Sequence, residues 1–201
     1  MRLRLFATLL GLPVLLVVAF FRIRSGARWG TAALEFVVGA YALLVASMVF
    51  LPVFLDPAER ARQALSAARF GLDWFNPVPF RTIGALVARA TSTQRSLAIA
   101  NTIMLLPLGV LVPVAFPWFR DWRRFVVLAL GASVAIEFGQ YLQRALGVAF
   151  RSVDIDDVIL NTLGAVLGFA IFCAGAWVYG RLRAPASPVE QSLRADAQKS
   201  S

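Results

Sequence analysis

The sequence predicts an all-α fold: a polytopic membrane helix bundle of about five transmembrane helices, with one long interfacial connection between helices two and three. Two observations support this prediction. The chain has 201 residues, of which 59% are hydrophobic. Its apolar residues gather in runs of roughly 20 residues, the length that a helix needs to cross a bilayer. A soluble domain of this size would interrupt each run with charged residues.

The first two apolar runs lie at residues 3–21 and 29–55, with arginines between them. The first run has no small-residue cleavage site at its end, so we expect a retained helix rather than a cleaved signal peptide. The second run is long enough to span the bilayer with some tilt. It carries Glu35, which we expect to form an ion pair with Arg28 on the same helix face.

The connection at residues 56–95 is the one long hydrophilic segment. It opens on a helix start, with Asp56 as the N-cap, Pro57 in the first turn and Glu59 completing the cap pattern. An aromatic and proline-rich turn follows at residues 73–80, and apolar residues at helical spacing come after it. This pattern is typical of a segment that lies in the plane of the membrane interface.

Three further spans are expected at residues 97–116, 125–143 and 158–179. Thr91 and Gln94 form a capping box ahead of the third span, in which Pro107 and Pro113 predict kinks. We therefore divide the chain into a first helix with its basic loop at 1–28, a membrane domain at 29–180 and a disordered polar tail at 181–201.

Arginines gather in the short connections after spans one, three and five. Because short basic loops stay on the cytoplasmic side of a membrane, we expect the amino terminus outside and the carboxyl terminus in the cytoplasm. The long connection and the loop between spans four and five then face outward.

The amino-acid composition limits which partners and which catalytic chemistry the protein can have. The formal net charge is +9, and every basic residue except Lys199 is an arginine. Arginines between spans suit lipid phosphates, and no nucleic-acid motif accompanies them, so we expect no nucleic-acid partner. The chain has no histidine, which excludes histidine-dependent triads and histidine-ligated metals, and its single Cys173 can form no intrachain disulfide. Any acid–base or metal chemistry must therefore use carboxylates.

Polar residues within or beside the spans are candidate site residues, because a charge at membrane depth costs at least a few kcal/mol unless it is protonated, paired or hydrated. With alternating spans, the polar residues of helices three, four and five reach similar depth and can line one pocket open to the outer surface. The candidates are Asn76, Asn101, Glu137, Gln140, Arg144, Arg151, Asp154, Asp156, Asp157 and Asn161.

A structural interpretation competes with this one. Polar side chains often join transmembrane helices by hydrogen bonds, and acidic residues complement a helix N-terminus. We favour the structural interpretation for Ser133, Asn101 and Asn161 taken singly, and a functional one for the cluster as a whole. The spacing of Gly164 and Gly168 indicates close helix packing.

Four motifs follow one another along the chain: Asn76-Pro77-Val78-Pro79-Phe80; Asn101 with Leu106-Pro107-Leu108-Gly109; Ser133-x-x-x-Glu137-x-x-Gln140; and Arg151-x-x-Asp154-x-Asp156-Asp157-x-x-x-Asn161-x-x-Gly164-x-x-x-Gly168. In this ordered series, the chain resembles the VanZ-like family over about residues 30–180. The resemblance implies a multi-pass protein of the bacterial inner membrane. For the family's namesake it also implies reduced susceptibility to glycopeptide antibiotics, teicoplanin in particular, but it supplies no mechanism.

The first functional hypothesis is a cell-envelope protein that binds or modulates an anionic lipid or lipid-linked wall precursor at the outer face. Arg151, with Arg144, would hold the anionic group through its fork of donors. The polar part of the ligand would bind to Glu137, Gln140 and Asn161.

Two other classes stay open at this point. In a membrane-embedded enzyme acting on a lipid-linked substrate, Asp154, Asp156 and Asp157 would hold Mg²⁺ or a similar hard divalent cation, since such metals prefer oxygen ligands. In a proton-coupled transporter, Glu137 would titrate because burial disfavours its charged form. The sequence leaves open whether the protein is an enzyme and which oligomer it forms.

Overall fold

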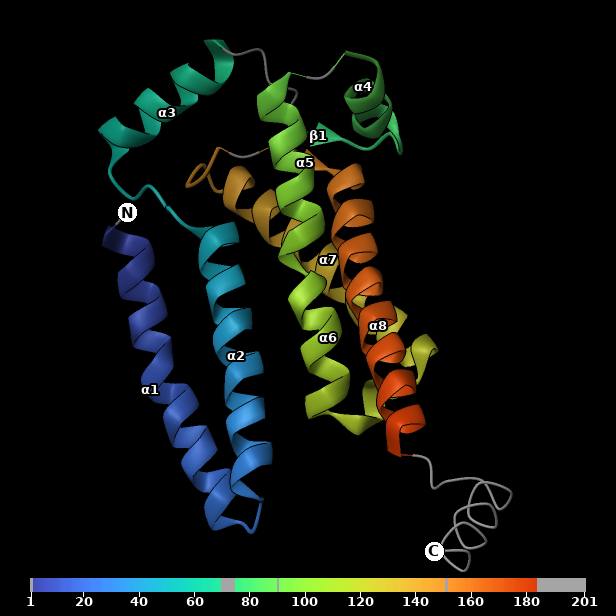
Figure 1. The fold of residues 1–201 in the computed structure, drawn as a ribbon. Helices are drawn as coiled ribbons and strands as arrows, with labels where there is room; N and C mark the ends of the chain where they lie inside the picture. Colours follow the sequence, from blue (N-terminus) through green and yellow to red (C-terminus); the bar gives the residue numbers. More distant parts are fainter. Residues whose placement is uncertain (1, 70–74, 90, 151, 184–201) are drawn as a thin grey trace, which may run out of the picture.

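The computed structural model describes residues 2–69, 75–89, 91–150 and 152–183. Long helices run side by side through the molecule, with shorter helices at one end (Figure 1). The elements in chain order are α1 (Arg2–Arg24), α2 (Trp29–Phe50), α3 (Pro57–Arg69), β1 (Phe75–Asn76), α4 (Arg81–Arg89), α5 (Ser92–Met104), α6 (Leu106–Ala115), the short 3₁₀ helix η1 (Pro117–Arg120), α7 (Trp122–Ala145), β2 (Val153–Asp154) and α8 (Ile155–Arg183).

The predicted all-α membrane bundle is confirmed. Within the described residues, four segments are long and apolar enough to cross a membrane: Trp29–Phe50, Gln94–Ala115, Trp122–Ala145 and Ile155–Arg183. The expected span at residues 3–21 lies in α1, which packs against α2 (Figure 1). A fifth crossing by α1 stays a prediction. The helix starts predicted at Asp56 and Thr91 are confirmed by side-chain caps on the following backbone N–H groups.

Prolines set the end of the second span, which differs from the expected one, and the kink predicted at Pro107 in the third span, which is confirmed. The second span ends at Phe50 rather than near residue 55, because Leu51 precedes Pro52 and adopts an extended conformation. The third span is broken at Leu105 into α5 and α6, since Pro107 lacks an N–H and its ring clashes with the preceding turn. Tyr41 of α2 donates a hydrogen bond of 3.0 Å to a carbonyl at this break.

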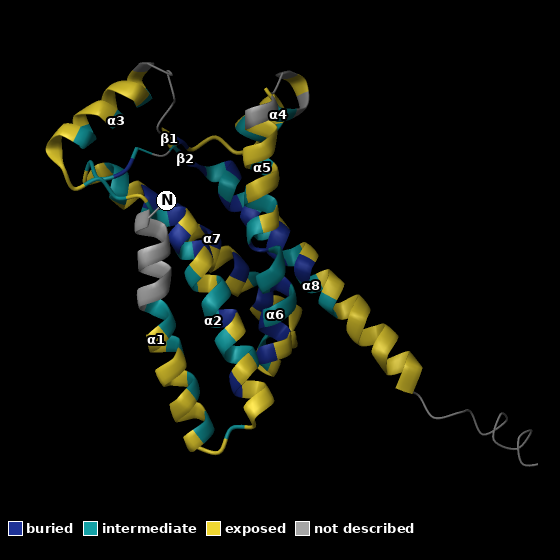
Figure 2. Ribbon diagram, turned by 60° about the vertical axis from the view of Figure 1, so that its left-hand side comes forward, coloured by how far each residue is buried: buried dark blue, intermediate teal, exposed yellow. Residues whose placement is uncertain are grey.

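Close packing of α8 against α5 and α6 depends on glycine. A Cβ at Gly164 would overlap the carbonyl oxygen of Thr102, and one at Gly168 would overlap that of Leu106. The packing role predicted from the glycine spacing is therefore confirmed. Buried residues gather where α2, α6, α7 and α8 meet, whereas the last turns of α8 are exposed (Figure 2).

The ion pair predicted for Glu35 is wrong in its partner. Arg22 of α1, rather than Arg28, binds both carboxylate oxygens of Glu35, at 2.6 and 2.8 Å. The antiparallel packing of α1 and α2 brings the guanidinium fork of Arg22 opposite the carboxylate (Figure 1). Arg28 occupies the N-cap of α2 in an extended conformation instead of the helix face.

We predict that Gly164→Ala destabilises the helix bundle, because the added methyl group must displace the backbone of α5. Overpacking of this kind costs about 1–3 kcal/mol. Gly175→Ala is the matched control, since nothing lies within 4 Å of a Cβ there and alanine favours a helix by up to about 1 kcal/mol. Melting temperatures in detergent compare the two variants, and equal melting would contradict the packing role of Gly164.

Candidate functional site

A short parallel strand pair brings the turn before α4 to the start of α8. Strand β1 pairs with β2 so that Phe75 lies opposite Val153 and Asn76 opposite Asp154. The two segments are far apart in sequence, and α4, α5, α6, η1 and α7 lie between them along the chain. The pairing therefore places the residues of the first and fourth sequence motifs beside one another.

Asp156 binds the backbone at the N-terminus of α4. Its carboxylate accepts hydrogen bonds from the N–H groups of Phe80 at 2.6 Å, Thr82 at 2.7 Å and Ile83 at 3.0 Å. Phe80 adopts a left-handed conformation with φ of 64°, which a non-glycine residue rarely does and which turns its N–H toward the carboxylate. Asp156 is 0% exposed, so these donors replace the water that a charged group requires.

Asp154 joins the same turn to the first turn of α8. One carboxylate oxygen accepts from the side-chain amide of Asn76 at 2.9 Å and from the backbone N–H of Asp156 at 2.9 Å. The other accepts from the hydroxyl of Thr82. Asp154 thus caps α8 and orients the turn with one side chain.

Glu137 connects α7 to this arrangement. It is buried, and its Oε2 accepts a hydrogen bond from the backbone N–H of Asp154 at 3.2 Å. We name the connected side chains the polar clamp, which consists of Asn76, Thr82, Glu137, Asp154 and Asp156. The clamp joins α7, α8 and the segment that leads into α4 at one end of the bundle.

Three other candidates lie near the clamp on the packed helices. Asn101 of α5 forms a side-chain hydrogen bond with Asp157 of α8. Asn161, one turn further along α8, is 1% exposed, and among the described residues no donor reaches its Oδ1. Gln140 of α7 is buried one turn from Glu137.

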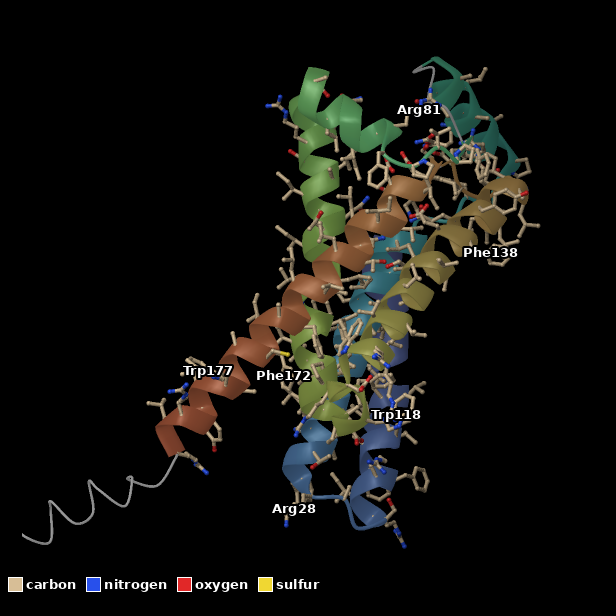
Figure 3. The ribbon with its side chains drawn as sticks, turned by 90° about the vertical axis from the view of Figure 1, so that its right-hand side faces the viewer. Arg28, Arg81, Trp118, Phe138, Phe172 and Trp177 are labelled. Atoms are coloured by element: carbon tan, nitrogen blue, oxygen red, sulfur yellow. The ribbon has the colours of Figure 1, made fainter. Side chains whose placement is uncertain are left out.

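Of the two arginine candidates, Arg144 lies within the described residues. The guanidinium of Arg144, near the end of α7, lies 5.5 Å from the ring centre of Phe150. Arg151 lies outside the described residues. Arg81 was absent from the predicted set, yet it begins α4 directly after the turn that Asp156 binds (Figure 3).

Ser133 belongs to the helix interface. Its hydroxyl donates to the carbonyl of Ala129 at 2.9 Å and accepts from the hydroxyl of Thr162 at 3.0 Å. Ser133 is fully buried between α7 and α8. Both contacts agree with the structural interpretation favoured for this residue in the sequence.

The aspartates proposed as metal ligands have different surroundings. Asp154 and Asp156 use their oxygens to accept hydrogen bonds from the turn and from α8. Asp157 points instead to Asn101. Among residues 2–69, 75–89, 91–150 and 152–183, no group of three or more His, Cys, Asp or Glu side chains is arranged to hold a metal ion.

Sequence reasoning missed Thr82, which binds Asp154 through its hydroxyl and Asp156 through its N–H. A usable signal exists: Thr82 closely follows a proline-rich turn at the start of a helical pattern, where Ser and Thr side chains commonly form hydrogen bonds.

Comparison with known proteins identifies the family. The VanZ/LLP1 family model matches residues 38–178, which is more than half of the chain. The chain belongs to the VanZ/LLP1 family. No curated protein and no solved structure shows significant similarity to it. The matched range includes the whole polar clamp, so its geometry is that of a VanZ/LLP1 domain.

We predict that Asp156→Ala releases the turn before α4, because it leaves three backbone N–H groups without an acceptor. Each unsatisfied buried group costs about 1–3 kcal/mol. Amide hydrogen exchange at Phe80, Thr82 and Ile83 should become faster, with less change in α7.

Asp121→Ala is the control for this experiment. It removes an exposed N-cap of α7 that accepts one backbone N–H at 3.0 Å, which is a loss of about 1 kcal/mol. If amide exchange in the turn before α4 is unchanged in Asp156→Ala, the carboxylate does not hold that turn.

Proposed function

We propose that this VanZ/LLP1 protein is a cell-envelope protein that binds an anionic lipid or a lipid-linked wall precursor at the end that carries the polar clamp. The observation that carries the proposal is the unpartnered Oδ1 of Asn161, which is buried beside a cluster of carboxylates and amides. A buried acceptor without a donor costs about 1–3 kcal/mol. A ligand that donates a hydrogen bond to this oxygen would explain why the protein keeps a buried acceptor without a partner.

The location of the cluster suits a ligand that enters from the membrane surface. Asn161 lies six residues after Ile155, the first residue of α8, which places it roughly 9 Å from the helix start. Polar and ionisable residues within membrane helices face the bundle interior or a water-filled cavity, and they often mark substrate or ion pathways. The exposed outer faces of the same helices are apolar, which suits contact with acyl chains.

Arginines at the same end suit the anionic part of such a ligand. Arg81 begins α4, and Arg144 lies in the last turn of α7. A guanidinium binds phosphate oxygens through two parallel N–H donors. The ligand's phosphate would bind these arginines, and its hydroxyl or amide groups would reach Asn161 and Gln140.

Binding is favoured over metal-dependent catalysis by the hydrogen bonds of the clamp. Asp156 accepts three backbone N–H groups, and Asp154 accepts two side-chain donors and one backbone donor. A divalent cation would have to displace several of these donors from each carboxylate.

We further propose that the clamp end faces outward from a bacterial plasma membrane, with the amino terminus outside and the carboxyl terminus in the cytoplasm. The arginine-rich connection after α1, the helix η1 and the basic end of α8 all lie toward the opposite end (Figure 1), and short basic connections favour the cytoplasmic side. Occupancy of the site by a wall precursor would then change the precursor's exposure to glycopeptides such as teicoplanin.

The binding test uses the full chain in nanodiscs and a polyprenyl diphosphate-linked precursor as the probe. We expect saturable binding that Arg144→Gln weakens about tenfold or more, since hydrogen bonds to charged groups contribute about 1.5–3 kcal/mol. Asn161→Leu should weaken binding while its melting temperature stays the same or rises, because it removes an unpaired buried oxygen. Arg62→Gln on α3, where Arg62 faces Glu59 at 3.8 Å, is the matched control and should bind as the unmodified protein does.

Three results would contradict this function. Absence of saturable binding, or equal weakening by Arg144→Gln and Arg62→Gln, would overturn the proposed site. A rise in melting temperature with Mg²⁺ that Asp157→Asn abolishes would favour the membrane-embedded enzyme instead.

A further inference from the structure

A second surface with defined chemistry lies at the end opposite the polar clamp. It is a groove at the junction of η1 and α7, near the labelled Trp118 (Figure 3). Its lining consists of aromatic, basic and aliphatic side chains: Trp118, Phe119, Arg123, Arg124, Val127 and Leu128. None of these residues belongs to the clamp, and the proposed function does not use them.

The two arginines of the groove are held over aromatic rings. The guanidinium of Arg124 lies 4.5 Å from the ring centre of Trp118, and that of Arg123 lies 5.5 Å from that of Trp122. In the part of the chain that the structure describes, neither arginine forms an ion pair with a carboxylate. The nearby Asp121 uses its carboxylate to accept the backbone N–H of Arg124. The groove therefore presents two positive charges that are oriented but not neutralised.

The apolar wall continues from these arginines into the membrane. Val127 and Leu128 follow one turn further along α7, on the side of the bundle's middle, and Val127 is 71% exposed. One helical turn corresponds to roughly 5 Å along the axis. The groove thus offers cations at the level of the headgroups and aliphatic side chains at the level of the first acyl carbons.

We propose that this groove binds one anionic phospholipid, with its phosphate at Arg123 and Arg124 and an acyl chain along Val127 and Leu128. Two guanidiniums favour a headgroup with net negative charge over a zwitterionic one, which brings its own cation to the site. The apolar wall favours a lipid over free phosphate, because only a lipid buries hydrocarbon there. The tryptophan Trp118 shields the phosphate contacts from the aqueous side.

The test is native mass spectrometry of the full chain in detergent with phosphatidylglycerol, phosphatidylcholine or glycerol 3-phosphate added. We expect one tightly retained phosphatidylglycerol, weak retention of phosphatidylcholine and none of glycerol 3-phosphate. The double variant Arg123→Gln/Arg124→Gln should weaken phosphatidylglycerol binding by about thirtyfold, which is about fivefold for each arginine near a lipid surface.

The matched control is the double variant Arg181→Gln/Arg183→Gln. Those arginines also lie over aromatic rings, Trp177 at 4.8 Å and Tyr179 at 4.6 Å, but they do not line the groove. The control should keep its phosphatidylglycerol. Equal losses in the two double variants, or equal retention of phosphatidylglycerol and phosphatidylcholine, would overturn the proposal. Val127→Ser should weaken the binding of phosphatidylglycerol. Unchanged binding in this variant would exclude the acyl-chain contact.

Discussion

The three hydrogen bonds that Asp156 accepts from the backbone before α4 hold the polar end of the molecule together. They fix the start of α4 against the start of α8, and this placement brings Asn76 and Thr82 onto Asp154. A fully buried carboxylate is stable there because backbone donors replace its water and because the positive ends of two helix dipoles face it. The positions of Asn76 and Thr82 in the clamp depend on this contact.

The bundle separates two kinds of chemistry along its length. Buried carboxylates and amides gather at the clamp end, whereas arginines that lie over tryptophan rings occur beside η1 and at the basic end of α8. Glycines between the two ends let the backbone of α8 approach α5 and α6. Close packing of small residues leaves little freedom for the helices to slide, so side chains at both ends are held at fixed depth.

Much of the fold follows from local sequence, and the wrong predictions concern contacts between separate segments. Apolar runs predicted the membrane helices, and proline placed the break at Leu105. The partner of Glu35 was wrong because Arg22 reaches it from another helix, which periodicity within one helix does not reveal. In the same way, periodicity did not reveal that the aspartates of one short motif accept hydrogen bonds from different groups, or that Thr82 belongs to the clamp.

The sequence by itself determined the membrane class, the family resemblance and the general depth of the polar residues, because each depends on composition or on spacing within one segment. Only the tertiary structure decided which donor meets which carboxylate. Asn76 and Asp154 lie 78 residues apart along the chain, and their contact depends on how the helices α4, α5, α6, η1 and α7 between them pack. Hydrogen bonds are short and directional, so positions that spacing predicts to within a helical turn do not specify them.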